Sequence, residues 1–147
     1  MFIFQGVLPE NIDRVWPQVA ELLTEAVLRS KDEGYTLEGV YEELKENLQQ
    51  LWLCIDINTA KPFIAGTTKV YTDTAGEKVC FILFMGGSRL ADTFRTFEWI
   101  EDWAKAEGCS YITSYCRPGI YRKFLNESNG WEYVAHSNKK IIVEKRI

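Results

Sequence analysis

The apolar residues of the chain change between helical and extended spacing, and these changes outline its elements. The first eight residues, MFIFQGVL, predict a strand that ends before Pro9. From Glu10 to about Arg29 apolar residues recur every three or four positions, which is the spacing of one buried helix face. Pro17 lies inside this stretch and predicts a short first turn or a kink, with the main helix starting near it.

A second helix is predicted after the break SKDEGY, where Thr36 can cap the N-terminus. Its expected apolar face consists of Leu37, Val40, Tyr41, Leu44 and Leu48. The spacing then becomes extended in three dense segments, LWLCIDI, FIAGTTKVYT and VCFILFM, which are joined by the polar turns NTAKP and DTAGEK. Three strands with such short connections predict an antiparallel meander.

The glycine pair Gly86-Gly87 predicts a turn into a third helix, which starts near Leu90 and ends at Gly108. The apolar stripe of this helix is Phe94, Phe97, Ile100, Trp103 and Ala104. A strand, CSYITSYC, a short helix opened by Pro118 and a final hairpin of GWEYVAH and KKIIVEK complete the chain. Because a helix links the fourth and fifth strands, these two strands are expected to be parallel neighbours.

The predicted order is β-α-α-β-β-β-α-β-α-β-β, in one α+β domain that covers residues 1–147. Its mixed central sheet has about seven strands flanked by four helices. A chain of 147 residues is long enough to bury a core, and 46% hydrophobic residues argue against disorder. The pattern contains no repeat and no linker.

Charge and composition narrow the classes of function. The net charge of −4 disfavours nucleic-acid binding, because no basic stripe is available to neutralise phosphates. The basic tail NKKIIVEKRI has only four Lys or Arg residues, which a solvated strand edge explains. We expect no membrane partner and a cytoplasmic location, because the sequence has neither a membrane-length apolar run nor the basic region and cleavage site of a signal peptide.

The cysteines do not form a metal-binding pattern. Cys54, Cys80, Cys109 and Cys116 stand singly in apolar or strand-like segments, and His136 is the only histidine. A zinc site needs closely spaced Cys and His ligands. We therefore expect no metal, and four buried, reduced thiols.

The element order and three short motifs carry a resemblance to a known family. The motifs are MGG before the third helix, RPG after the fifth strand and NGW at the start of the sixth. Together they resemble the GNAT (Gcn5-related N-acetyltransferase) fold over essentially the whole chain. More narrowly, MGG…WIEDWAKAEGCSYITSYCRPG…NGW is similar to the small GNAT-like proteins of bacteriophages and prophages.

The resemblance implies a cofactor site at the end of the fourth strand. In active GNAT enzymes a Gln/Arg-x-x-Gly-x-Gly/Ala signature follows this strand, and its N–H groups hold the pyrophosphate of acetyl-CoA. The candidate cofactor-binding residues here are Gly86, Gly87, Ser88 and Arg89. The glycines come early, and Asp92 is expected to place a carboxylate in the first turn of the helix, so the loop is degenerate. A purely structural turn is the alternative interpretation.

The family also supplies candidates for catalysis. Many members use a tyrosine on the fourth helix to protonate the leaving thiolate, and Tyr121 is the candidate here. A half-buried helix tyrosine without a catalytic role is the simpler interpretation. Asp56, Asp73 and Glu77 are candidate bases, but strand alternation and turn formation explain them as well. His136 is expected at the surface of the last hairpin. Four glutamates either attract a basic amine or form a solvated helix face: Glu38, Glu42, Glu43 and Glu46.

Two functions remain open. The first is a phage-type GNAT-fold protein related to acyl-CoA-dependent N-acetyltransferases, with acetyl-CoA and an amine as ligands if it is active. The second is a non-catalytic binding or virion-assembly protein of a bacteriophage, located in the host cytoplasm or the virion, whose partner is a phage or host protein. Trp99 lies one step off the apolar stripe, so partial exposure is expected, which suits a partner surface.

Overall fold

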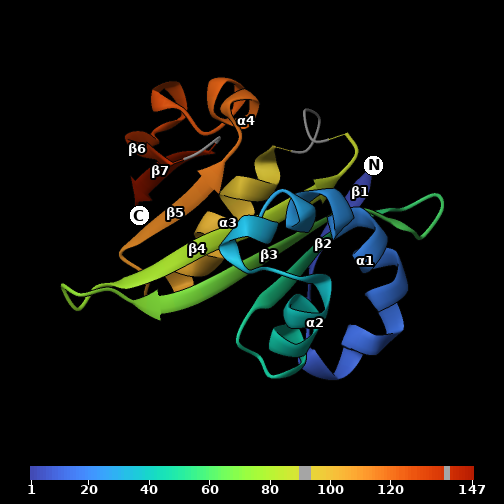
Figure 1. The fold of residues 1–147 in the computed structure, drawn as a ribbon. Helices are drawn as coiled ribbons and strands as arrows, with labels where there is room; N and C mark the ends of the chain where they lie inside the picture. Colours follow the sequence, from blue (N-terminus) through green and yellow to red (C-terminus); the bar gives the residue numbers. More distant parts are fainter. Residues whose placement is uncertain (90–93, 138–139) are drawn as a thin grey trace. The chain divides into compact units, whose positions relative to one another are not determined.

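The structure, a computed structural model, describes residues 1–89, 94–137 and 140–147. Within these residues the strands form one seven-stranded sheet in the order β1-β2-β3-β4-β5-β7-β6 (Figure 1). The strands are β1 (Phe2–Val7), β2 (Gln50–Asp56), β3 (Pro62–Thr72), β4 (Lys78–Gly87), β5 (Tyr111–Cys116), β6 (Glu132–Ser137) and β7 (Lys140–Arg146). The α-helices are α1 (Ile12–Leu28), α2 (Leu37–Lys45), α3 (Arg95–Ala106) and α4 (Pro118–Lys123). This arrangement confirms the predicted α+β class and element order.

The strand pairing confirms one prediction and corrects another. β4 and β5 are parallel, with Val79 opposite Tyr111 and Ile82 opposite Ser114, as expected from the intervening helix. β1–β2, β2–β3, β5–β7 and β6–β7 are antiparallel. The basic tail was expected at a sheet edge, but β7 pairs with β5 and β6 and is therefore an interior strand. All residues of the edge strand β6 are exposed.

The contacts of the chain divide it into two compact units. The N-terminal unit comprises Met1–Lys69 and Phe84–Thr93, and the C-terminal unit comprises Val70–Leu83 and Phe94–Ile147. Both β3 and β4 therefore contribute residues to each unit. No helix in the described part of the chain is long and apolar enough to span a membrane.

In the N-terminal unit, α1 buries the face that the apolar spacing predicted: Ile12, Val19, Leu23 and Val27. Pro17 lies inside this helix, which begins at Ile12, so the prediction that the main helix starts near the proline was wrong. The first four N–H groups of a helix have no intrahelical partner in any case. At the sixth position Pro17 removes only one backbone hydrogen bond, and the helix continues through it.

Both ends of α2 have identifiable causes. The Thr36 hydroxyl oxygen accepts a hydrogen bond from the Gly39 N–H at 3.0 Å, which confirms the predicted cap. The helix ends at Lys45, because Asn47 adopts a left-handed backbone conformation with φ of 61°. Leu48 was expected on the buried face but lies beyond this turn and is 50% exposed.

In the C-terminal unit, α3 buries Thr96, Phe97, Ile100 and Ala104. Trp99 is half-buried, as its position beside the apolar stripe predicted. The first turn that was predicted from Leu90, including the expected carboxylate of Asp92, lies outside the described residues.

All four cysteines are buried and unbonded, as expected. Burial raises the pKa of the Cys54 and Cys80 thiols to about 12. Apolar surroundings disfavour the thiolate, so these groups are poor nucleophiles and poor metal ligands. No group of three or more His, Cys, Asp or Glu residues in the described ranges is arranged to hold a metal ion.

Candidate functional site

Gly86 and Gly87 are the last residues of β4, so the predicted turn begins only after them. A Cβ atom on Gly86 would lie 2.2 Å from the carbonyl oxygen of Leu22 in α1. A Cβ atom on Gly87 would lie 2.1 Å from the carbonyl oxygen of Phe63 in β3, and Gly87 has φ of 127°. Both glycines are therefore required by the close approach of two backbones.

Ser88 and Arg89, the two residues after the glycines, form non-covalent contacts with β2 and β3. The Ser88 N–H donates to the carbonyl oxygen of Phe63 at 2.9 Å. Arg89 has φ of 58°, and its guanidinium lies 3.8 Å from the centroid of the Phe63 ring. Its Nη2 donates to Oδ2 of Asp56 at 3.1 Å. The cation that was predicted to face a phosphate thus has an aromatic ring and a carboxylate as neighbours in its own unit.

The Asp56 carboxylate is held in its ionised form. Its Oδ1 accepts hydrogen bonds from the N–H groups of Asn58 at 2.8 Å and Thr59 at 3.3 Å. The bond from Asn58, then those from Thr59 and Arg89, lower the pKa of Asp56 below its usual value against the opposing effect of desolvation. The Asp56 side chain is 20% exposed and belongs to a turn-stabilising network, which is a structural role.

Tyr121, the candidate general acid, lies on α4 in the C-terminal unit. It is half-buried, and its ring packs edge-on against Tyr133 with the centroids 6.1 Å apart. The Tyr133 hydroxyl is hydrogen-bonded to Nδ1 of His136, which lies on the exposed strand β6 as predicted. These contacts account for Tyr121 as a packing residue, and its catalytic role stays a prediction.

The other candidate bases also have structural partners. Asp73 accepts hydrogen bonds from the N–H groups of Ala75 and Glu77 and from the Tyr111 hydroxyl at 2.8 Å. The Glu77 N–H, followed by Tyr111, lowers the pKa of Asp73, while burial and then Asp73 raise the pKa of Tyr111 to about 12. Both carboxylate oxygens of Glu77 accept from Arg146, at 2.8 and 2.9 Å. This network fixes the β3–β4 hairpin to β5 and β7.

The acidic face predicted for α2 is largely solvated. Glu38, Glu42 and Glu46 are exposed. Glu43 is half-buried and pairs with Lys69 at 3.0 Å. The prediction of a solvated helix face therefore agrees with the exposure of Glu38, Glu42 and Glu46.

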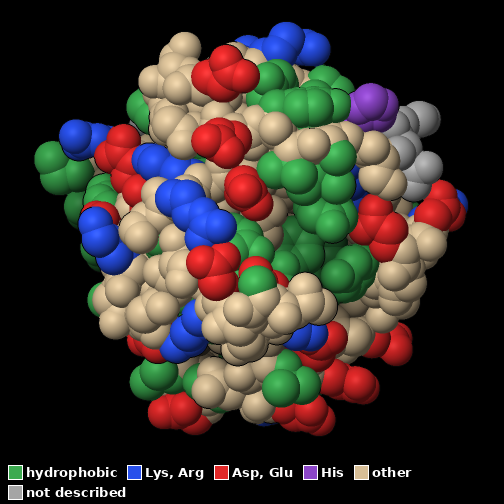
Figure 2. Space-filling view, turned by 90° about the vertical axis from the view of Figure 1, so that its left-hand side faces the viewer, with side chains coloured by type: hydrophobic (Ala, Val, Ile, Leu, Met, Phe, Trp, Pro, Cys, Tyr) green, Lys and Arg blue, Asp and Glu red, His purple; other side chains and the backbone are tan. Residues whose placement is uncertain are grey.

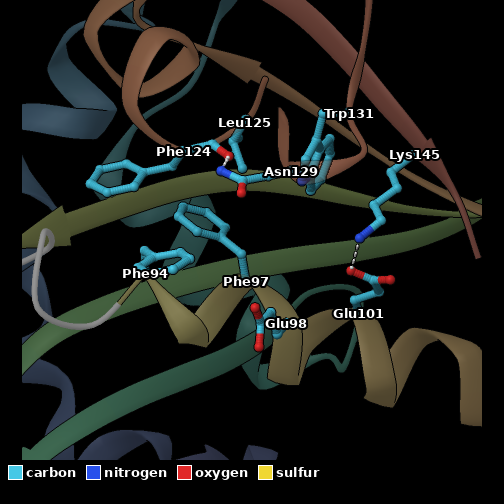
Figure 3. A pocket seen from close by; sticks show the side chains of 9 residues that line it. All are labelled: Phe94, Phe97, Glu98, Glu101, Phe124, Leu125, Asn129, Trp131 and Lys145. Carbon is cyan, nitrogen blue, oxygen red and sulfur yellow. Dashed lines mark hydrogen bonds and ion pairs between the residues drawn. The ribbon is translucent and has the colours of Figure 1, made fainter. Parts of the chain in front are cut away.

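A pocket that the sequence did not indicate lies in the C-terminal unit, between α3 and the segment that follows α4 (Figure 3). It has a volume of about 70 Å³. Phe94, Phe97 and Phe124 gather at one end, and Trp131 and the Glu101–Lys145 pair lie at the other. The local signal in the sequence was the spacing of Phe94 and Phe97 at the start of α3, because the other wall comes from residues more distant in the chain.

No protein-family model and no curated protein matches the chain by sequence. Solved structures match it over nearly its full length. They include a GNAT-family acetyltransferase from Listeria monocytogenes (TM-score 0.65, 11% identity, 99% of this chain and 95% of that one). Gcn5 from Tetrahymena matches with a TM-score of 0.68 at 9% identity, over 99% and 96% of the two chains. A chain of the NatC complex bound to Gag peptide and CoA matches with a TM-score of 0.74 at 12% identity, over 99% and 98%. The chain therefore has the GNAT fold.

Proposed function

We propose that this chain is a GNAT-scaffold protein, related to acyl-CoA-dependent N-acetyltransferases, whose degenerate pyrophosphate loop no longer supports acetyl transfer. The observation that supports the proposal most strongly is that a bulky residue, Phe94, stands at the start of α3, where the signature requires a small one. Counted from Arg89, the signature Gln/Arg-x-x-Gly-x-Gly/Ala places its two small residues at Asp92 and Phe94. Phe94 precedes α3 as its N-cap residue, and its ring stacks on Phe124 with the centroids 5.7 Å apart and the planes at 12°.

A pyrophosphate site needs small residues at these positions for a physical reason. The phosphate oxygens must approach the unpaired N–H groups of the helix N-terminus, and the absence of a side chain allows that approach. A carboxylate at the first of these two positions would repel the anion, and the phenyl ring at the second adds bulk where a small residue is needed. The residues present therefore do not fit the pyrophosphate of acetyl-CoA.

The surroundings of Arg89 support the same conclusion. Its guanidinium contacts Phe63 and Asp56 within the N-terminal unit. A pyrophosphate would have to compete with the Asp56 carboxylate for this cation. The glycine pair before it is likewise explained by contacts with the backbone of Leu22 and Phe63.

We infer that the scaffold serves protein binding, as a single domain of residues 1–147 in a phage-type protein active in virion assembly or in contact with a host protein. The role is suggested by the resemblance of the motifs MGG, RPG and NGW to small phage GNAT-like proteins. Exposed aromatic residues of the C-terminal unit support it too: Tyr71, Tyr115 and Tyr133 are each at least 40% exposed. Figure 2 shows hydrophobic side chains exposed at the surface among acidic and basic ones.

An acetyl-CoA-dependent N-acetyltransferase is the second candidate. The observation that favours it is the match to the NatC chain, whose structure contains CoA, over almost all of both chains. In this case Tyr121 would be the general acid, and Gly86, Gly87, Ser88 and Arg89 would contact the cofactor. Fold similarity at this identity does not establish the activity.

A restored signature tests the proposal. We expect the double variant Asp92→Gly/Phe94→Ala to bind acetyl-CoA at least about tenfold more tightly than the natural chain, because an anion repeller and an obstructing ring are removed. Arg89→Glu in that background should abolish the gain. Calorimetric titration measures the acetyl-CoA affinity of all three proteins.

Micromolar binding of acetyl-CoA by the natural chain, with release of free CoA thiol in the presence of an amine, would instead establish the enzyme. Co-purification from infected cells then identifies the protein partner.

A further inference from the structure

We propose that the pocket between α3 and the segment after α4 binds a small organic cation of the alkylammonium or methylammonium class. This site lies within the C-terminal unit, and it shares only Phe94 with the pyrophosphate signature. Four aromatic side chains line it, three phenylalanines and one tryptophan: Phe94, Phe97, Phe124 and Trp131. Aromatic faces attract cations through the negative potential of their π-systems, most strongly for tryptophan.

The volume selects a ligand of a particular size. A cavity needs about 10–15 Å³ of this kind of volume for each water-sized occupant. The pocket's volume of about 70 Å³ therefore accommodates about five heavy atoms. A trimethylammonium group has one nitrogen and four attached carbons, which matches this number.

The charges on the wall also favour a cation. Glu98 lines the pocket, is exposed, and has no ion-pair or hydrogen-bonding partner among the residues that the structure describes. Glu101 and Lys145 neutralise each other, with Oε2 and Nζ 3.0 Å apart. The lining therefore carries one uncompensated negative charge beside aromatic rings, a combination that favours a desolvated cation.

Both walls of the pocket are fixed before any ligand binds. Phe94 and Phe97 are three residues apart, as are Glu98 and Glu101, so α3 and its N-cap residue Phe94 present them on one side. On the opposite wall, the Asn129 side chain donates to the carbonyl oxygen of Phe124 at 2.8 Å. The Asn126 carbonyl oxygen accepts from the Trp131 N–H at 3.0 Å. A preformed site loses little conformational entropy on binding.

Choline and neohexyl alcohol, its uncharged carbon isostere, form the direct test. We expect choline to shift the indole N–H resonance of Trp131 in a two-dimensional NMR titration of the full chain, with saturation below about 10 mM. Neohexyl alcohol should bind at least about fivefold more weakly, because it has the same shape without the charge. Equal binding of the two compounds would overturn the proposal, as would the absence of any shift with choline. Saturation by adenosine with no response to choline would contradict it as well.

Two substitutions at exposed or half-buried charges should change the affinity in opposite directions. Glu98→Gln removes the unpaired carboxylate and should weaken choline binding by up to about fivefold. Lys145→Gln leaves Glu101 unpaired beside the pocket and should tighten binding by a similar factor of up to about fivefold. Glu42→Gln on α2 has the same change of net charge as Glu98→Gln and should leave the affinity unchanged. If Glu98→Gln and Glu42→Gln have equal effects, only the net charge matters and the site is refuted.

Discussion

Alanine at Gly86 tests whether the glycine pair serves backbone packing. The added Cβ would lie 2.2 Å from the Leu22 carbonyl oxygen and 3.2 Å from its carbonyl carbon, whereas ordinary contacts begin at 3.4 Å. The neighbouring atoms belong to the backbone of α1, so no side-chain rotation can relieve the overlap. Strand or helix must move by about 1 Å, and overpacking of this kind costs about 3 kcal/mol. For a chain of this length that lowers the melting temperature by about 10 °C.

Two other glycines provide matched controls. Gly119 lies in α4 with open space at its Cβ position, so Gly119→Ala should leave stability unchanged or raise it by up to about 1 kcal/mol. Gly76 also has open space but φ of 83°, so Gly76→Ala should cost only the strain of a left-handed residue, about 1 kcal/mol.

Urea unfolding followed by tryptophan fluorescence measures the free energy of unfolding for all three variants and the natural chain. The expected order of destabilisation is Gly86→Ala, then Gly76→Ala, then Gly119→Ala. A value for Gly86→Ala within about 0.5 kcal/mol of the natural chain would refute the packing explanation. Close packing would then not explain Gly86, and a role in ligand binding would be the better explanation.

Three further expectations concern titrating groups and a helix cap. The pKa of Asp56 is lowered on folding, first by the hydrogen bond from the Asn58 N–H. The stabilisation that this carboxylate contributes is therefore present above the unfolded pKa of about 3.9 and is lost as the pH falls through the folded pKa. The urea midpoint of Asp56→Asn should fall less steeply on acidification than that of the natural chain, and equal slopes would contradict this. Burial raises the pKa of Tyr111 to about 12, so its stabilisation is present below about pH 10 and is lost as the pH rises toward that value. Ultraviolet titration should show a phenol that ionises late and disappears in Tyr111→Phe, and an identical titration curve for the two proteins would contradict this. Thr36→Ala should lower the free energy of unfolding by about 1 kcal/mol and Thr36→Ser by much less, and equal losses would argue against the cap.

Elements that depend on local spacing could be predicted from the sequence. The buried face of α1 follows from the periodicity of apolar residues, and the Thr36 cap follows from a hydrogen bond between residues three apart. The parallel pairing of β4 with β5 follows from the helix that connects them. The predicted fold class follows from the order of these elements. Local rules failed at Leu48, because one left-handed residue, Asn47, ended the helix earlier than its apolar spacing suggested.

The candidate site was less predictable, because its contacts join distant parts of the chain. The Arg89–Asp56 pair and the packing of Gly86 on Leu22 cannot be read from spacing, since both require the folded sheet. The pocket likewise brings Phe94 against Phe124. The sequence did indicate the place of the glycines at the end of the fourth strand, while the structure supplied the reason for them.

Calorimetric titration of the natural chain with acetyl-CoA tests the central claim most directly. The account predicts no saturable binding up to about 1 mM, because Phe94 and Asp92 occupy the positions of the small residues and Arg89 pairs with Asp56. A micromolar dissociation constant that Arg89→Glu abolishes would contradict it and would establish a working cofactor site at the end of β4.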